Sequence, residues 1–214
     1  MAPYLPADRE TRILELGCGM GFCLMMLRDL GYNRIEGIDS DPEQVKFCQE
    51  KKLPVIRTIN SQNYLDQHGE SYDLVLAMDL IEHIPHEDQM DYVRTIGRSL
   101  KKGGVLICTV PNASSPLAFR YRYNDWTHHS SFTESSLSYL LAHSGFSDIE
   151  VKESGSLMKP RHLWVIRPTV MRWLLLRFTR IVRRLQLIGE LGFREGVRIP
   201  LSLNLLARAK RNNG

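Results

Sequence analysis

The sequence lacks the features that mark several classes of protein. No run approaches the roughly 18 consecutive apolar residues of a membrane-spanning helix, and the first residues, MAPYLPADRETR, contain no apolar signal stretch. Cysteine is scarce, and the four that occur are not spaced like metal ligands: Cys18, Cys23, Cys48 and Cys108. We therefore expect a cytoplasmic protein whose cysteines are reduced core thiols.

Acidic residues are scarce in one part of the chain. Residues 1–150 carry 14 lysines and arginines against 21 acidic residues, whereas residues 151–214 carry 14 against 3. The 214 residues, of which 43% are hydrophobic and 24% charged, suit one α/β domain with an appendage. We predict a single domain over residues 1–214, with an acidic body and a basic C-terminal segment.

The stretch from Arg12 to Asp41 has the pattern of half a nucleotide-binding fold. An apolar strand is followed by the glycine turn GCGMG, a helix and a second strand that ends in Asp39, whose carboxylate can accept hydrogen bonds from two ribose hydroxyls. The turn contains no lysine or arginine and lacks the G-x-G-x-x-G that seats a pyrophosphate. A ligand with a ribose and a cationic centre therefore fits better than NAD, and a nicotinamide-dependent oxidoreductase is the less favoured interpretation.

Two further stretches turn this pattern into a family resemblance. ELGCGMG and GIDSD resemble the first two motifs of the class I S-adenosylmethionine-dependent methyltransferases, and SYDLVLAMDLIEHIP is similar to their strand-four motif. The resemblance implies a Rossmann-like three-layer α/β sandwich with a mostly parallel seven-stranded sheet in the order 3-2-1-4-5-7-6, strand 7 being antiparallel. The family usually has a helix before the first strand, for which residues 1–11 leave no room. We therefore expect an open cofactor site, a cover supplied elsewhere or a shortened chain.

The same resemblance implies S-adenosyl-L-methionine as the cofactor and assigns residues to it. The glycines take the methionine moiety, Glu15 orients the turn or the amino group, and Asp39 holds the ribose. Residues 60–62 surround the adenine, with Asn60 where an aspartate is commoner, and residues 78–80 wall the methyl-transfer site. The predicted set is Glu15, Gly17, Cys18, Gly19, Gly21, Phe22, Asp39, Ser40, Asn60, Ser61, Gln62, Met78, Asp79 and Leu80.

Apolar periodicity and turn residues predict the remaining elements. Strands are expected at Pro54–Ile56, Tyr72–Met78, Val105–Val110, Ser147–Glu153 and Ile199–Arg208. Helices are expected after the Asp41-Pro42 cap, over Met90–Leu100 with Lys101–Gly104 ending it, and after the Thr133 cap. The periodicity disappears over residues 113–133, which predicts a long irregular loop with a functional role.

This loop carries the candidate catalytic residues. Its segment DWTHHSSFT resembles, more loosely, a segment of methyltransferases that act in sugar and polysaccharide modification. That implies a hydroxyl acceptor on a sugar, a glycan intermediate or a lipid-linked small molecule, with a quinone-type lipid next. An alcohol needs a proton acceptor, and the candidates are His128, His129 and His83. A divalent metal on Asp125, His128 and His129 is an alternative, but their spacing does not show a closed ligand set, so no metal site is predicted.

Residues 160–196 are predicted to form a basic helical insertion before the last strand, with a helix over residues 168–188. One side of this helix is apolar, and the remainder carries five arginines and no acid: Arg172, Arg177, Arg180, Arg183 and Arg184. Packing on the chain's own sheet, packing on a second subunit in a homodimer, and docking on an anionic membrane at its inner face stay open. Nucleic acid is disfavoured because no known binding module is present. The alternative to an enzyme is a non-catalytic cofactor-binding module that recruits a partner or a membrane through this helix.

Overall fold

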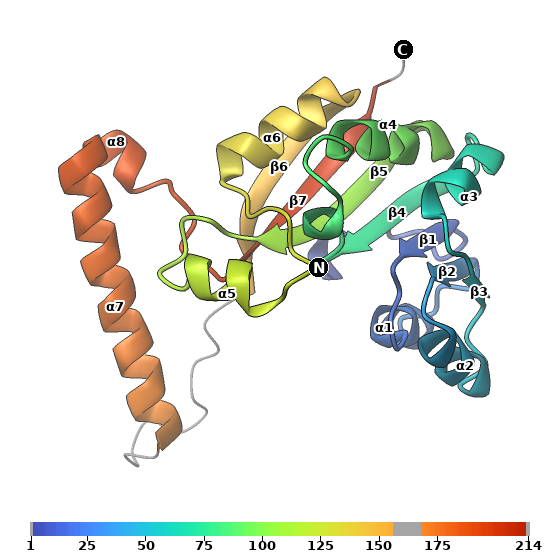
Figure 1. Cartoon of the computed structure of the whole chain (residues 1–214), viewed down its shortest axis with the longest axis horizontal. Helices are drawn as coiled ribbons and strands as arrows, with labels where there is room; N and C mark the ends of the chain where they lie inside the picture. Colours follow the sequence, from blue (N-terminus) through green and yellow to red (C-terminus); the bar gives the residue numbers. More distant parts are fainter. Residues whose placement is uncertain (1, 156–167, 213–214) are drawn as a thin grey trace.

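The protein is built on a seven-stranded sheet, seen in a computed structural model that describes residues 2–155 and 168–212 (Figure 1). The strand order is β3-β2-β1-β4-β5-β7-β6, and β7 alone runs antiparallel to its neighbours. The strands are β1 (Ile13–Leu16), β2 (Ile35–Asp39), β3 (Val55–Arg57), β4 (Tyr72–Met78), β5 (Leu100–Pro111), β6 (Phe146–Ser154) and β7 (Asn204–Arg211). The predicted fold class and strand order are confirmed.

Helices cover both faces of this sheet. The helices of the described residues are α1 (Phe22–Asp29), α2 (Pro42–Glu50), α3 (Ser61–Gln67), α4 (Gln89–Ser99), α5 (Ala118–Asn124), α6 (Glu134–His143), α7 (Pro168–Leu191) and α8 (Phe193–Gly196), with short 3-10 turns η1 (Ala2–Tyr4) and η2 (Ile81–His83). Of these, α7 and α8 stand at one end of the molecule and not on a face of the sheet (Figure 1). Leu14 and Leu16 pack into the core shared with α3, α4 and α6, whereas Ile13 packs on Leu27 of α1. This alternation along β1 separates the two helical layers of Figure 1.

Parallel pairing brings the predicted site to one edge of the sheet. Leu16, the last residue of β1, lies opposite Ile38 of β2 on one side and Ala77 of β4 on the other. The glycine turn, Asp39 and the segment after β4 therefore all leave the carboxyl ends of adjacent strands, where ligands bind in open α/β sheets.

Three element boundaries differ from those that the sequence predicts. Helix α4 ends at Ser99, and Lys101–Gly104 belongs to β5 because Leu100 is already extended and pairs with Tyr72. Helix α5 interrupts the predicted irregular loop, and it buries none of its residues, so no apolar periodicity marks it. Residues 199–203 stay outside β7, whose first residue is Asn204. Residues 160–167 of the predicted insertion lie outside the described residues.

Asn112, at the end of β5, fixes the irregular segment before β7. Its buried side-chain amide donates to the carbonyl oxygens of Pro200 (2.9 Å) and Ser202 (2.8 Å). Replacing Asn112 with alanine is expected to lower the free energy of unfolding by about 2 kcal/mol, because two carbonyls lose their donor. Urea unfolding measures this, with the exposed Asn33→Ala as the control that should change stability by less than about 0.5 kcal/mol. Equal losses in the two variants would contradict this role for Asn112.

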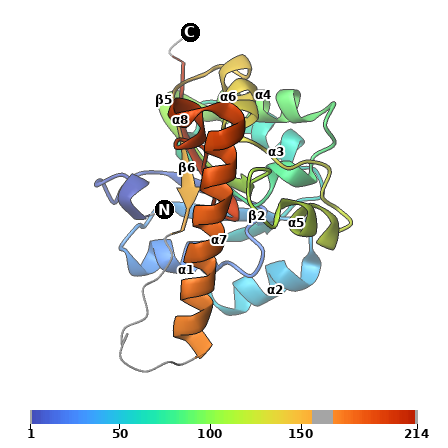
Figure 2. The ribbon, with the colours of Figure 1, turned by 90° about the vertical axis from the view of Figure 1, so that its left-hand side faces the viewer.

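Helix α7 is the longest helix, with 24 residues. It stands at one end of the molecule and runs in front of the sheet in the view from that side (Figure 2). Within the part of the chain that the structure describes, no helix, α7 included, combines the length and the apolar character that crossing a membrane would require.

Candidate functional site

The glycine turn between β1 and α1 has a backbone conformation and close packing that favour glycine at three positions. Gly17, Gly19 and Gly21 have φ angles of 61°, 54° and 71°, in the left-handed region that favours glycine. A Cβ atom at Gly21 would lie 2.5 Å from Leu53 Cδ1, and one at Gly17 would lie 3.1 Å from Leu80 Cδ1. The turn is thus packed against Leu53, which precedes β3, and against Leu80 in the segment after β4.

Asp39 ends β2 beside this turn. One carboxylate oxygen accepts a hydrogen bond from the amide of Gly19 (2.8 Å), and the other accepts from the amide of Asp41 (2.9 Å). These bonds aim the half-exposed carboxylate at the glycine turn. Ser40, the next residue, is exposed. The geometry suits the ribose-binding role that the sequence assigns to Asp39.

Glu15 lies under the turn as a buried acid, one oxygen of which, Oε2, has no hydrogen-bond partner among the described residues. Burial raises the pKa of the Glu15 carboxyl to about 7, against the smaller lowering effects of hydrogen bonds from Cys23 and Leu24. A buried carboxylate beneath the glycine turn suits a ligand that carries positive charge, as S-adenosylmethionine does.

The raised pKa of Glu15 predicts a pH-dependent stability. The folded protein holds this proton up to about pH 7, whereas the unfolded chain releases it near the ordinary pKa of 4.5. The contribution of Glu15 to the free energy of unfolding therefore falls as the pH rises through this window. Glu15→Gln is expected to melt progressively higher than the parent as the pH is raised from about 5 to 8. A melting difference between Glu15→Gln and the parent that stays constant with pH would contradict this.

Other predicted cofactor residues surround the turn with different degrees of exposure. Cys18 is buried in the core under α1 and α2, whereas Phe22 begins α1 with 71% of its surface exposed. Met78 and Leu80 are half-buried on either side of Asp79. Asp79 has a φ angle of 51°, and its Oδ1 accepts from Thr109 Oγ1 (2.8 Å) and Asn204 Nδ2 (2.9 Å). This left-handed residue turns the chain at the end of β4 and ties it to β5 and β7.

The side chains of the predicted adenine-binding residues form hydrogen bonds within the protein. Asn60 caps α3 by accepting from the amide of Asn63, Ser61 Oγ lies 2.9 Å from the Tyr92 hydroxyl, and Gln62 donates to Thr95 at 3.3 Å. Their contact with adenine stays a prediction. Beside them, Ile59 exposes 84% of its surface, an apolar side chain that our sequence analysis did not select.

A second group of predicted residues meets at the end of η2. Donor atoms of Glu82, His83 and His128 all lie within 4.8 Å of one another, and the two imidazole rings are 4.7 Å apart in an edge-on arrangement. Burial raises the pKa of Glu82 to about 8 and, with the nearby His128, lowers that of His83. Our sequence analysis missed Glu82, although the Glu-His pair after strand four was the available signal.

Hydrogen bonds assign the free nitrogen of each imidazole in this cluster. Thr127 donates its hydroxyl to Asp125 (2.7 Å), so its oxygen accepts from Nδ1 of His83 at 2.8 Å. Nδ1 of His128 lies 3.1 Å from the carbonyl oxygen of Tyr121 and donates to it. In the neutral form both rings therefore keep Nε2 as a proton acceptor.

His129 is not part of this cluster. Its backbone amide donates to the carbonyl of Glu82 at 2.8 Å, and its side chain is exposed. The side chain of His128 is half-buried in the cluster, whereas that of His129 is exposed. Among the described residues, the set that could hold a divalent cation is Glu82, His83 and His128, rather than the alternative set of Asp125, His128 and His129.

Comparison with known proteins shows which family the chain belongs to. The family model described as methyltransferase domain matches residues 1–151, which end within β6. The chain belongs to the methyltransferase family. The matched segment holds every residue that the resemblance assigned to the cofactor and all three candidate histidines, whereas α7 lies outside it.

Relatives of this methyltransferase include enzymes named for oxygen acceptors. The mitochondrial ubiquinone biosynthesis O-methyltransferase of Mus musculus is 30% identical over 47% of this chain, and the ubiquinone biosynthesis O-methyltransferase of Methylobacterium nodulans is 30% identical over 51%. The chain spans only 29% and 45% of the lengths of these relatives.

A solved structure with the same fold is a SAM dependent methyltransferase from Archaeoglobus fulgidus, with a TM-score of 0.70 and 23% identity over 98% of this chain and 89% of that one. The family match and this fold support S-adenosyl-L-methionine as the cofactor, as the glycine-turn motifs predict. The predicted class I methyltransferase family is confirmed.

Proposed function

We propose that this methyltransferase moves a methyl group from S-adenosyl-L-methionine to a hydroxyl oxygen of a sugar, a glycan intermediate or a lipid-linked small molecule such as a quinol. The observation that carries the proposal is the pair of imidazoles, His83 and His128, at the edge of the sheet where the glycine turn lies. The Nδ1 atoms of both rings are hydrogen-bonded, and Nε2 of His128 lies 3.9 Å from Asp125 Oδ2, whose negative charge favours the imidazolium that forms when His128 accepts a proton. A base of this kind can take the proton of a hydroxyl acceptor, and the names of the relatives support an oxygen acceptor independently.

The cofactor supplies an activated methyl group on a sulfonium leaving group. The chain therefore mainly has to align the acceptor with this methyl group and to accept the acceptor's proton. Gly17, Gly19 and Gly21 would hold the methionine moiety over Glu15, and Asp39 would hold the ribose. As the new C–O bond forms and the C–S bond breaks, Nε2 of His128 would take the hydroxyl proton. His83 stays neutral because burial and His128 lower its pKa, and it shields one side of the acceptor.

Exposed aromatic side chains beside the histidines suit an acceptor that is flat or apolar on one face. Phe119 and Tyr123 of α5 expose 82% and 72% of their surfaces, and Trp126 exposes 98%. Aromatic rings in water at the mouth of a site offer stacking surface to sugar rings, quinols or prenyl chains. Their place between the end of β5 and His128 supports an acceptor-binding role for this loop.

A methyl-transfer assay with labelled cofactor tests the proposal. The acceptors are nucleotide sugars, polyprenyl-phosphate sugars, demethylated quinols and, as the contrasting class, primary and secondary amines. Transfer to an oxygen acceptor that depends on His128 would support the proposal, and transfer confined to amines would contradict it. Cofactor binding with no transfer to any class would instead favour the alternative of a non-catalytic module.

The Glu82, His83 and His128 set supports a second candidate for how the acceptor is activated. A divalent cation on these donors would lower the pKa of a bound hydroxyl without a general base. Activity that is lost after dialysis against EDTA and restored by Mg²⁺ or Mn²⁺ would favour the cation, and EDTA-resistant activity the base. We propose a cytoplasmic location in either case, with an anionic membrane at its inner face as the partner.

A further inference from the structure

We propose that α7 docks on the surface of an anionic lipid bilayer, with its apolar side in the headgroup boundary and flanking arginines on lipid phosphates. The inference stands apart from the methyl acceptor and goes beyond the reaction proposed above. It rests on which side of α7 faces the protein and on the charges beside the other side.

The apolar side of α7 faces water. Six large apolar side chains share an arc of about 100° on this helix at 100° per residue. Each exposes 46–64% of its surface: Met171, Leu174, Leu175, Phe178, Val182 and Leu185. We call these six residues the apolar stripe. An apolar surface of this size, continuous over four turns, is unusual on a protein that has no partner for it.

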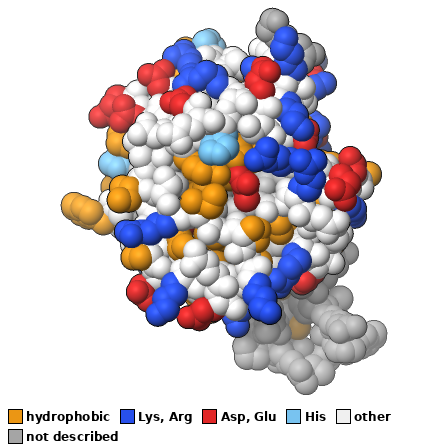
Figure 3. All heavy atoms as spheres, turned by 90° about the vertical axis from the view of Figure 1, so that its right-hand side faces the viewer, with side chains coloured by type: hydrophobic (Ala, Val, Ile, Leu, Met, Phe, Trp, Pro, Cys, Tyr) orange, Lys and Arg blue, Asp and Glu red, His pale blue; other side chains and the backbone are white. Residues whose placement is uncertain are grey.

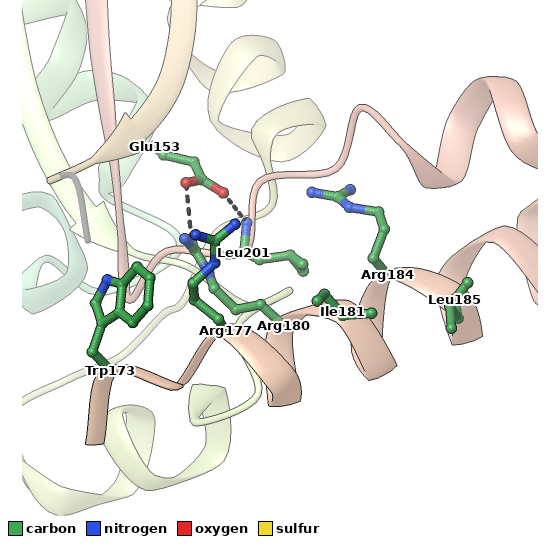
Figure 4. Close-up of a pocket in the computed structure, with 8 residues that line it drawn as sticks. All are labelled: Glu153, Trp173, Arg177, Arg180, Ile181, Arg184, Leu185 and Leu201. Carbon is green, nitrogen blue, oxygen red and sulfur yellow. Dashed lines mark hydrogen bonds and ion pairs between the residues drawn. The ribbon is translucent and has the colours of Figure 1, made fainter. Parts of the chain in front are cut away.

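The opposite side of α7 contacts the rest of the protein. Arg180 pairs with Glu153 of β6 at 2.9 Å, and Arg184 donates to the carbonyls of Gly196 (2.6 Å) and Ile199 (2.7 Å). Figure 4 shows these arginines directed from α7 toward Glu153 and the segment before β7, across a groove of about 460 Å³. A helix that packed on its own sheet would turn its apolar stripe inward, and α7 does the reverse.

The position of α7 is fixed at its C-terminal end. Helix α8 folds back on it so closely that a Cβ at Gly196 would lie 2.6 Å from the amide nitrogen of Ile188. Leu187 is buried there with Ile199 and Leu201. The outward direction of the apolar stripe therefore follows from packing and ion pairs, and it is not the orientation of a loosely attached helix.

Charge selects the partner of this stripe. Residues 168–189 contain five arginines and no acid. On the helix wheel, Arg172 lies about 60° beyond one edge of the apolar stripe, where lipid phosphates would meet it. Arg177 lies about 60° beyond the other edge, where its guanidinium stacks on the Trp173 ring at 4.9 Å and lines the groove beside Arg180 (Figure 4). The face at the opposite end of the molecule mixes acidic and basic side chains (Figure 3).

The same charges argue against a second copy as the partner. Two stripes packed face to face would bring together the arginines that flank them, Arg172 above all, and α7 offers no acid before Glu190 to pair with these arginines. Like charges at such an interface are repulsive. An anionic bilayer supplies both an apolar layer and the opposite charge.

Docking through α7 would orient the catalytic edge. The chain passes from α8 through residues 199–203 to Asn204, whose side chain donates to Asp79 at 2.9 Å. Asn112 at the end of β5 binds the same segment. Two hydrogen-bonded links thus connect the membrane-docking insertion to the ends of β4 and β5.

Vesicle flotation of the full chain tests this inference. The vesicles are phosphatidylcholine alone, or phosphatidylcholine with about one third phosphatidylglycerol. We expect binding to the anionic vesicles, at least tenfold weaker binding to the neutral ones, and at least a tenfold loss for the triple variant Leu174→Ser, Phe178→Ser, Leu185→Ser. Arg172→Gln with Arg177→Gln should reduce the preference for anionic vesicles severalfold.

A matched control changes exposed apolar residues elsewhere. Leu30→Ser with Tyr139→Ser removes side chains that are 39% and 59% exposed on the C-terminal side of α1 and on α6, and vesicle binding should not change. Melting temperatures confirm that all variants fold. Two results would overturn the inference. The first is vesicle binding that the triple variant retains. The second is a wild-type chain that binds no vesicles and is dimeric by light scattering, while the triple variant is monomeric.

Discussion

Replacing Asp39 with alanine is expected to weaken S-adenosylmethionine binding about 100-fold. The carboxylate would lose its charge-assisted hydrogen bonds to two ribose hydroxyls, each worth about 1.5–3 kcal/mol when not fully exposed to water. It would also release the amide of Gly19, which it now holds at 2.8 Å in the turn that binds the methionine moiety. Calorimetric titration with the cofactor and with S-adenosylhomocysteine measures the effect.

Asp41→Ala is the matched control for this prediction. Asp41 lies two residues after Asp39 in the same loop. It caps α2 by accepting hydrogen bonds from the amides of Glu43 (2.8 Å) and Gln44 (3.3 Å). Its loss should cost about 1 kcal/mol of stability and leave the affinity within about twofold. Asp39→Asn, which keeps an acceptor for Gly19, should lie between the parent and Asp39→Ala. Equal affinities for Asp39→Ala and the parent would remove the ribose assignment.

Replacing His128 with alanine is expected to lower kcat about 100- to 1,000-fold while changing the KM for the cofactor little, because a general base acts on the acceptor in the transition state. His83→Ala should lower kcat by a smaller factor, since it removes the neighbouring ring at 4.7 Å. The measurement is steady-state methyl transfer, with the acceptor found in the screen, as a function of pH.

His129→Ala is the control within the same loop. Its exposed side chain lies outside the cluster, so kcat should stay within about threefold of the parent. A large loss in His129→Ala with none in His128→Ala would reverse the assignment. If His128→Ala loses activity and the parent also needs Mg²⁺ or Mn²⁺ after EDTA, His128 acts as a ligand and not as a base.

Local sequence signals predicted the elements that carry the candidate cofactor site. The glycine turn and the acid that ends β2 lie within about 20 residues of each other. One local strand-turn-helix unit is therefore enough to bring them close together. The Asp41 cap of α2 and the Thr133 cap of α6 are both present in the structure for the same reason, since a cap bonds to amides two or three residues away.

The acceptor half depends on how distant segments meet, and the sequence predicted less of it. His83 and His128 are 45 positions apart, and their contact is set by the bonds of Thr127, Asp125 and the carbonyl of Tyr121 within an irregular chain. The burial of Glu82 could not be read from a polar pair after a strand. Helix α5 has no buried side, and Pro200, which has no amide hydrogen, precedes the strand that was predicted to include it.

The orientation of α7 was likewise beyond the sequence. Its apolar pattern indicates a partner for that side of the helix, but several partners fit the same pattern. The pairing of Arg180 with Glu153 and the binding of Arg184 to two carbonyls decide the direction, because they commit the basic side to the protein. Long-range polar contacts of this kind leave no trace in hydrophobic periodicity.

Calorimetric titration of the intact chain with S-adenosylmethionine, S-adenosylhomocysteine and NAD tests the central claim most directly. The turn of Gly17, Gly19 and Gly21 with Asp39 and the buried Glu15 predicts micromolar binding of the first two and no detectable binding of NAD. Glu15→Gln should weaken the binding of S-adenosylmethionine, which carries the additional positive charge, more than that of S-adenosylhomocysteine. Tighter binding of NAD, or no binding of either adenosyl ligand, would contradict the assignment of this edge of the sheet as a methyl-donor site.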